Sequence, residues 1–327
     1  MPTLSVHLLD TPKPEALEQL KRHCDPGILF TTGQPSAPGT YQVLVAGRPR
    51  LEHLAASPEL RILVIPYAGL PAATRELLLG FPKLAVHNLH HNAALTAEMA
   101  MALLLAAVKS VLPCDRALRQ NDWRPRYNPP PAISLEGKTV LILGFGQVGQ
   151  RIGRACYALG MQVLTVRRHA EQPIPVEYPV DVYNPAMLPQ LLPRAQILLV
   201  ALPATSATDG LLGERELALM PRGAVLVNVG RGAIVDQAAL YAALTSGQLG
   251  AAGLDVWYNY PHSQAEWVNT PPADYPFHTL DNVVLSPHRA GASTETESLR
   301  MTHLAGLLNA IARGGPIPNR VDVQAGY

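Results

Sequence analysis

This chain has few cysteines, few aromatic residues and a low net charge. Its three cysteines, Cys24, Cys114 and Cys156, lie far apart with no C-x-x-C spacing, which argues against a disulfide framework or a zinc site and favours a reducing cytoplasm. The formal net charge is only +1, so no global field would hold nucleic acid or an anionic membrane. The longest apolar run, near residues 99–108, is too short to span a bilayer, and we see no signal-peptide pattern. We therefore expect a cytoplasmic protein whose partner is a small molecule.

Short apolar runs rich in β-branched residues alternate with longer amphipathic stretches. This alternation predicts parallel sheets that are covered by helices on both faces. In the first series we expect strands at residues 5–9, 41–46, 61–65 and 83–87, and helices at 14–23, 51–56 and 72–79. In the second series we expect strands at residues 139–143, 162–166, 197–201, 225–228, 250–255 and 283–285.

A glycine-rich turn joins the expected strand 139–143 to a helix over 147–159. It reads Gly144-Phe-Gly146-Gln147-Val148-Gly149. The first glycine permits the tight turn, the second lets the backbone approach a pyrophosphate, and the third lets helix and strand pack closely. The helix start at Gln147 and Val148 then offers N–H groups and a partial positive charge to the anion. A turn without a ligand is the alternative, but the flanking strands and helix favour a Rossmann dinucleotide site.

The end of the second strand of this series bears on the choice of cofactor. An NAD site usually carries Asp or Glu there, but this chain has Arg167 and Arg168. Two guanidinium groups suit a 2′-phosphate, so we expect NADP in preference to NAD, unless the arginines are only a solvated strand end. Because ligands bind at the carboxyl ends of the strands in such sheets, further cofactor contacts are expected at a set of residues that follow these ends: Leu202, Pro203, Val229, Gly230, Arg231 and His288.

The length of 327 residues predicts two domains. A long helix over residues 96–110 is followed by a proline-rich segment over 121–132, which marks a crossing between domains. The simplest topology returns the last helix, about 294–313, to the first domain. The predicted fold class is therefore α/β with two doubly wound parallel-sheet domains: a flavodoxin-like substrate domain over 1–105 and 290–327, and a Rossmann NAD(P)-binding domain over 106–289.

Four further segments resemble the D-isomer-specific 2-hydroxyacid dehydrogenase family in order and spacing. The resemblance covers most of the chain from about residue 61 onward. The resemblance implies an oxidoreductase that transfers a hydride between NADP(H) and a small 2-oxo acid or D-2-hydroxy acid, assembled as a homodimer through the cofactor domain. The segments are Asn228-Val-Gly-Arg231-Gly-Ala-Ile-Val-Asp236, Gly253-Leu-Asp255-Val-Trp257, Ser286-Pro-His288-Arg-Ala-Gly291, and Thr96-Ala-Glu98-Met preceded by Asn92.

The resemblance implies a role for each matching position. Arg231 would bind the substrate carboxylate, His288 would exchange a proton with the substrate oxygen, and Asp255 would hold the nicotinamide carboxamide. Elementary chemistry supports the first two residue types, because a planar guanidinium matches a carboxylate and an imidazole titrates near neutral pH. The substrate-binding candidates are the loop Tyr67-Ala68-Gly69, whose N–H groups would bind the substrate carboxylate, and Asn92.

One position departs from the family pattern. The family has a glutamate five residues after the Asp255 equivalent, where it pairs with the histidine, but this chain has Tyr260. A phenol can orient an imidazole by hydrogen bonding, yet it cannot offset positive charge as a carboxylate does. We therefore expect His288 to lack the usual upward influence on its pKa, with Arg289 lowering that pKa further if the two side chains point the same way.

Three explanations for Tyr260 stay open. Another carboxylate, such as Glu266 or Asp274, could fold back to serve His288. The reaction could need little proton transfer, as in the formate dehydrogenase branch of the family. The chain could instead be a weakly active or inactive NAD(P)-binding sensor or scaffold, because fold and cofactor site alone do not establish chemistry.

A cluster of histidines follows the expected strand 83–87. His87, His90 and His91 could bind a metal, line a substrate cleft or be ordinary loop residues. Because no carboxylate or thiol completes a ligand set, we expect no metal site. The three tryptophans, Trp123, Trp257 and Trp267, are expected to be packing residues.

Overall fold

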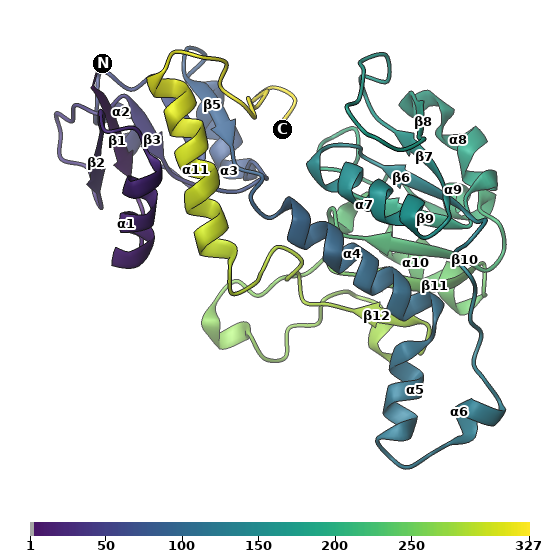
Figure 1. The fold of residues 1–327 in the computed structure, drawn as a ribbon. Helices are drawn as coiled ribbons and strands as arrows, with labels where there is room; N and C mark the ends of the chain where they lie inside the picture. The colour runs from purple at the N-terminus through teal and green to yellow at the C-terminus, as the bar shows by residue number, and fades with distance from the viewer. Residues whose placement is uncertain (1–2) are drawn as a thin grey trace. The chain divides into compact units, whose positions relative to one another are not determined.

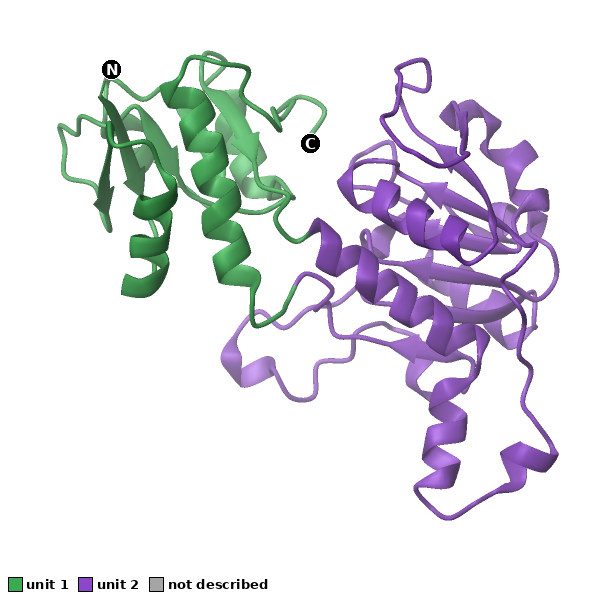
Figure 2. Ribbon diagram, viewed as in Figure 1, with its two compact units in different colours: residues 1–92, 292–327 green, residues 93–291 purple. Residues whose placement is uncertain are grey.

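The computed structural model describes residues 3–327, which form two compact units (Figure 2). Unit 1 comprises residues Met1–Asn92 and Ala292–Tyr327, and unit 2 comprises Ala93–Gly291. The first crossing thus lies at residue 92, whereas the sequence placed it at residue 105. The reason is helix α4 (Ala93–Val108), which packs on the sheet of unit 2 so closely that a Cβ at Gly253 would overlap Leu103.

Unit 1 is built on a five-stranded parallel sheet with the order β2-β1-β3-β4-β5 (Figure 1). In this doubly wound order the chain adds strands first on one side of β1 and then on the other, so the topological switch point lies between β1 and β3. The strands are β1 (Leu4–Leu8), β2 (Ile28–Thr32), β3 (Val43–Val45), β4 (Ile62–Ile65) and β5 (Ala85–Asn88). The helices are α1 (Pro14–His23), α2 (Leu51–Ala55), α3 (Ala72–Leu79) and α11 (Thr296–Ala312), the last of which packs with the sheet strands in one apolar core.

Unit 2 is built on a seven-stranded parallel sheet with the order β12-β11-β10-β9-β6-β7-β8. Its switch point lies between β6 and β9, as in Rossmann domains, and the predicted α/β fold class is confirmed. The strands are β6 (Thr139–Leu143), β7 (Gln162–Val166), β8 (Asp181–Tyr183), β9 (Ile197–Val200), β10 (Ala224–Asn228), β11 (Leu249–Leu254) and β12 (Val283–Leu285). Besides α4, the helices are α5 (Val111–Leu118), α6 (Arg124–Tyr127), α7 (Gln147–Ala158), α8 (Leu188–Leu191), α9 (Glu214–Leu219) and α10 (Gln237–Thr245).

The sequence did not predict β2 and β8, and both lie at the edge of a sheet. Most of β2 after Ile28 is at least partly exposed, and β8 is three residues long and contains no buried residue. β2 contains the apolar run Ile28-Leu29-Phe30, of which only Ile28 is buried, and β8 is Asp181-Val-Tyr183.

Among residues 3–327, no single helix is long and apolar enough to cross a membrane. Helices α4 and α5 meet the criteria of length and composition only as a pair, with a 67° bend between them. Eight residues of α4 are buried, and seven of them belong to an apolar core of unit 2.

Candidate active site

The glycine turn after β6 has the geometry of a dinucleotide-binding loop. Gly144 has φ +92°, and a Cβ there would lie 2.7 Å from the Ala201 carbonyl oxygen, while a Cβ on Gly149 would overlap the carbonyl of Gly144. Gly146 differs, because a Cβ there would meet no heavy atom within 4 Å. It is also the N-cap of α7 and has no side chain to satisfy the first N–H groups of that helix. The space and the donors at Gly146 fit a pyrophosphate.

The other cofactor candidates all follow the carboxyl ends of strands in the same sheet. Because the strands are parallel, these ends share one edge, and the structure brings the candidates together along it. Among them, the Arg167 guanidinium donates to the Gln172 side-chain oxygen at 3.5 Å. The residues are Arg167 and Arg168 after β7, Leu202 and Pro203 after β9, Val229 and Gly230 after β10, Asp255 after β11, and His288 after β12.

The turn that carries Arg231 is held by the buried side chain of Asn228. Its amide donates to the Arg231 carbonyl oxygen at 2.9 Å, and its oxygen accepts from the Gly230 N–H at 3.0 Å. The exposed Arg231 guanidinium donates to the Gly230 carbonyl oxygen at 2.7 Å. One amide side chain therefore fixes the backbone from which the arginine extends.

The buried carboxylate of Asp255 organises the loop that carries His288. It accepts hydrogen bonds from the Ser286 hydroxyl at 2.5 Å, the Arg289 N–H at 2.9 Å and the Ala290 N–H at 3.0 Å. His288 itself has φ +53°, an uncommon conformation for a residue with a side chain, which needs support from its surroundings. The carboxamide contact expected of Asp255 stays a prediction, whereas its hydrogen bonds to this loop are observed.

The electrostatic surroundings of His288 hold its pKa below the usual range. Partial burial is the largest cause, the positive charge of Arg231 adds to it, and the negative charge of Asp255 opposes both. Arg289, which we expected to contribute, instead supplies its N–H to Asp255, and the cation that acts on the imidazole is Arg231.

Tyr260 meets His288 through its ring. The two ring centroids are 5.4 Å apart, tilted by 55°. Our expectation of an orienting hydrogen bond is corrected, because the phenol oxygen accepts instead from the Trp257 N–H at 3.0 Å. Burial raises the pKa of Tyr260, so the phenol is neutral near pH 7 and offers no charge to the imidazole.

The two carboxylates that could have replaced the missing glutamate are engaged elsewhere. Glu266 accepts from the His262 N–H and the Ser263 hydroxyl, and Asp274 accepts from the side chains of Asn259 and Gln237. The explanation that either one folds back onto His288 is therefore wrong for this structure.

The substrate-binding candidates belong to unit 1. Tyr67, Ala68 and Gly69 follow β4 at the carboxyl edge of its sheet, and the Asn88 amide donates to the Ala68 carbonyl oxygen at 2.7 Å. Asn92 is the last residue of the unit before the chain crosses into α4. The loop and Asn92 thus lie near the ends of β4 and β5, and their contact with substrate stays a prediction.

The histidine cluster of unit 1 is partly buried and faces cations. His87 donates through Nδ1 to the Pro318 carbonyl oxygen at 2.8 Å. Burial, together with Arg300, His303 and His90, lowers the pKa of His91 to about 4. Within residues 3–327, no group of three or more His, Cys, Asp or Glu side chains could hold a metal ion.

Three supporting residues were missed in the sequence as functional positions: Asn228, Ser286 and Trp257. A polar residue that ends an apolar strand, as Asn228 does, is a signal that could have identified one of them, because a buried amide needs partners. The packing role expected of Trp257 is confirmed by its burial in the core, and its hydrogen bonds add a second role. The same expectation is wrong for Trp123 and Trp267, which are 59% and 70% exposed.

Comparisons with known proteins identify the family of this chain. The model of the D-isomer specific 2-hydroxyacid dehydrogenase NAD binding domain matches residues 101–290. The chain is 34% identical over 328 residues to a glyoxylate reductase of Aeropyrum pernix, across 94% of this chain and 93% of that protein. It is 37% identical over 235 residues to a glyoxylate reductase of Korarchaeum cryptofilum, across 70% of this chain and 66% of that protein.

A solved structure extends the likeness to the whole fold. The D-isomer specific 2-hydroxyacid dehydrogenase from Xanthobacter autotrophicus, in complex with NADPH and MES, superposes with a TM-score of 0.79 at 25% identity, across all of both chains. The family model alone spans more than half of the chain. This chain therefore belongs to the D-isomer specific 2-hydroxyacid dehydrogenase family.

Proposed function

We propose that this protein is an NADP(H)-dependent reductase of small 2-oxo acids, which also oxidises the corresponding D-2-hydroxy acids. The observation that carries the proposal is that Arg231 and His288 lie close enough for the guanidinium to lower the pKa of the imidazole, at the sheet edge that also holds the open Gly146 turn. A carboxylate anchor and a proton donor are then side by side.

The residues of this chain would divide the work as follows. Arg231 binds the substrate carboxylate through two parallel hydrogen bonds and polarises the neighbouring carbonyl. His288, when protonated, gives its proton to the carbonyl oxygen, so the C=O group becomes CH–OH. NADPH, when bound, supplies the hydride that the carbonyl carbon accepts. In unit 1, the N–H groups of the Tyr67-Ala68-Gly69 loop, together with Asn92, would complete the substrate contacts.

We infer a preference for NADP(H) from the two arginines after β7. Arg167 and Arg168 offer guanidinium groups where a ribose 2′-phosphate would need them, and no carboxylate occupies the end of that strand. The NADPH complex of the Xanthobacter autotrophicus relative supports the same cofactor.

The experiment that tests the function is a panel of 2-oxo acids, including glyoxylate and hydroxypyruvate, assayed by loss of reduced-nicotinamide absorbance with NADPH and NADH in parallel. We expect turnover of at least one acid and a higher kcat/KM with NADPH. Tight NADPH binding without turnover of any acid would instead support a sensor or scaffold. Much tighter binding of NADH would contradict the role given to Arg167 and Arg168.

The phenol beside His288 predicts an unusual pH profile. Reduction needs a protonated imidazole, and the lowered pKa of His288 means that the rate falls as the pH rises through that low pKa. Tyr260→Glu places a negative charge beside the ring, which raises the pKa of His288 and moves the falling limb to higher pH by about 1 unit or more.

Steady-state kinetics across pH, with Tyr260→Gln as an uncharged control, measure this effect. The glutamine variant should keep the low-pH profile. An unchanged limb in the glutamate variant would show that Tyr260 does not occupy the place of the charge partner.

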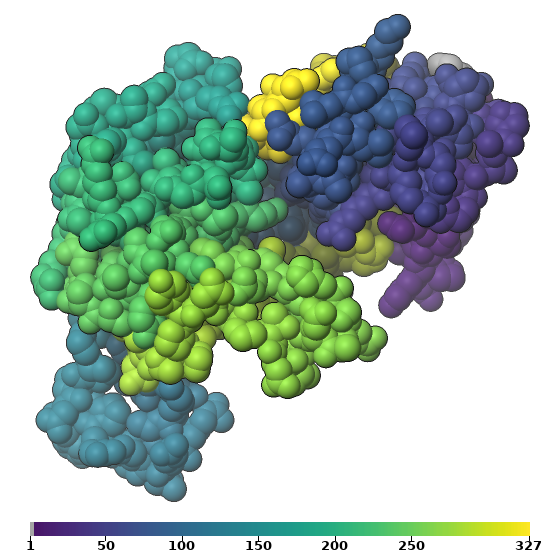
Figure 3. Space-filling view, turned by 180° about the vertical axis from the view of Figure 1, so that it is seen from behind, coloured from purple at the N-terminus to yellow at the C-terminus, as the bar shows by residue number. Residues whose placement is uncertain are grey.

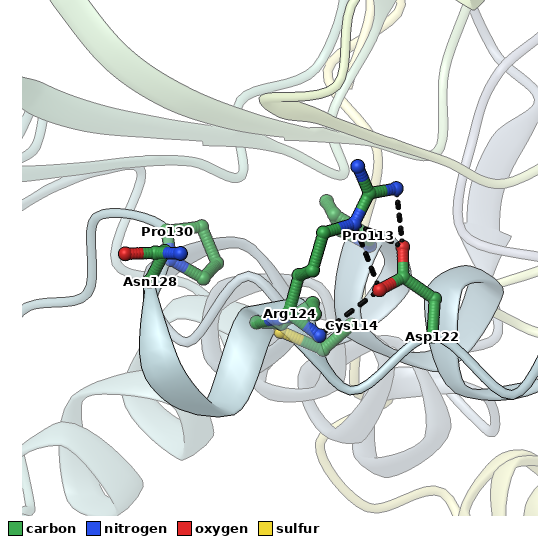
Figure 4. A pocket seen from close by; sticks show the side chains of 7 residues that line it. Pro113, Cys114, Asp122, Arg124, Asn128 and Pro130 are labelled. Atoms are coloured by element: carbon green, nitrogen blue, oxygen red, sulfur yellow. Dashed lines mark hydrogen bonds and ion pairs between the residues drawn. The ribbon is translucent and has the colours of Figure 1, made fainter.

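We further propose a homodimer formed through unit 2, in a cytoplasmic setting that suits three unpaired cysteines. The segment of α5 and α6 projects from the rest of unit 2 (Figures 1 and 3). It exposes Leu118, Trp123 and Tyr127, and the Asp122 carboxylate pairs with the Arg124 guanidinium to hold its turn (Figure 4). Exposed apolar side chains on a projecting segment favour burial against a second copy of the chain. Sedimentation equilibrium tests this proposal by measuring the mass of the assembly in solution.

A further inference from the structure

Trp257 makes contact with each of the three segments that carry the candidate active-site residues. Its backbone N–H donates to the Tyr260 hydroxyl at 3.0 Å, and its indole Nε1–H donates to the Ser286 carbonyl oxygen at 2.8 Å. Its backbone carbonyl packs on the turn after Arg231, where a Cβ on Gly232 would overlap it. Trp257 is buried, so these contacts are shielded from water.

The bond to Ser286 matters most, because that carbonyl oxygen also accepts the backbone N–H of His288, at 3.0 Å. The indole thus fixes the group that in turn fixes the left-handed backbone of the histidine. The Ser286 hydroxyl is bound to Asp255 on the other side, so Ser286 is held through both its side chain and its carbonyl.

We propose that Trp257 is a positioning residue, whose indole N–H sets the place of the His288 imidazole relative to Tyr260 and Arg231. The inference rests on the proposed function of this site, and it adds a residue that touches neither substrate nor cofactor. A phenylalanine would fill much of the same space in the core, yet it has no N–H to donate. The indole ring packs in the core of unit 2, and its N–H fixes the Ser286 carbonyl that positions His288.

Loss of that nitrogen has a defined electrostatic consequence. With one donor gone, the Ser286 carbonyl and the His288 loop relax toward solvent. The imidazole then becomes better hydrated and moves away from Arg231, and these are the two causes that lower its pKa. The pKa of His288 should therefore rise toward its ordinary value.

The test compares Trp257→Phe with the wild-type protein in kinetics across pH. We expect the maximal kcat for reduction to fall about tenfold or more because the imidazole is misplaced, while the KM for the 2-oxo acid changes less than about twofold because Arg231 still binds the carboxylate. The pH range in which kcat for reduction falls should move to higher pH. Trp267→Phe is the matched control, because Trp267 is 70% exposed and its substitution should leave all three quantities unchanged.

A titration of the His288 ring by NMR gives a readout that does not require turnover. A raised His288 pKa in Trp257→Phe supports the inference, and an unchanged pKa together with wild-type kcat overturns it. If Trp257→Phe does not fold, Trp257→Met, which also lacks the indole N–H and adapts to irregular core space, takes its place, and an unchanged His288 pKa together with wild-type kcat in that variant overturns the inference. A wild-type protein that turns over no acid would defeat the proposed function, while the NMR titration would still decide the role of Trp257.

Discussion

In Arg231→Ala, kcat/KM for 2-oxo acid reduction should fall by about 10³-fold. The variant loses two charge-assisted hydrogen bonds to the substrate carboxylate, each worth about 1.5–3 kcal/mol, and every 1.4 kcal/mol is a factor of ten. Arg231 is exposed, and within residues 3–327 its guanidinium donates to the Gly230 carbonyl oxygen alone, so its loss should leave the thermal stability almost unchanged. Steady-state kinetics measure the first effect, and thermal denaturation measures the second.

Arg289→Ala is the matched control for this result. It also removes a guanidinium beside His288, but Arg289 contributes only its backbone N–H to the loop, so kcat/KM should change less than about threefold. The pKa of His288 should rise in Arg231→Ala and stay constant in Arg289→Ala, because only the first variant removes the charge that lowers it. Full activity in Arg231→Ala would remove the anchor from the proposed mechanism.

In Gly146→Val, the affinity for NADPH should fall by about 10- to 100-fold while the protein stays folded. Among the described residues, apart from the two chain neighbours, no heavy atom lies within 4 Å of a Cβ at this position, so the added side chain would enter the space proposed for the pyrophosphate. Forcing extra carbon atoms into a fitted contact costs about 1–3 kcal/mol, which sets the expected range. Fluorescence titration with NADPH measures the affinity, and thermal denaturation measures the fold.

Gly306→Ala provides the control for adding carbon to a glycine. Gly306 lies within α11 and is likewise free of neighbours within 4 Å, so this substitution should stabilise the helix by about 1 kcal/mol and leave NADPH binding unchanged. Wild-type affinity in Gly146→Val would place the dinucleotide somewhere other than the N-terminus of α7.

The parts of the site that could be predicted from sequence are those set by local rules. The glycine turn is one of them, because the backbone within a few residues of each position determines why a glycine is needed there. The central strands are another, because both of their faces are buried and their apolar runs are continuous. The family segments around Arg231 and His288 then placed the chemistry on these strand ends.

The parts that could not be predicted depend on tertiary contacts. The Tyr260 hydroxyl accepts the backbone N–H of Trp257, three residues earlier in the chain, and this hydrogen bond depends on how the turn after Trp257 folds. The carboxylate oxygens of Asp255 similarly accept hydrogen bonds from a loop that lies more than 30 residues later in the chain. No periodicity or spacing in the sequence reports such pairings, because many polar partners are possible before the sheet brings two of them together.

The return of α11 to unit 1 has a consequence for how the chain is made. The apolar core beneath β1, β3 and β4 is closed by Met301, Leu304 and Leu308, which leave the ribosome after all of unit 2. Unit 2 is continuous in the chain and can complete its fold first, whereas residues 1–92 wait with an uncovered sheet face. Until α11 has been synthesised, the apolar side chains of this sheet face stay uncovered, so completion of unit 1 depends on the last part of the chain.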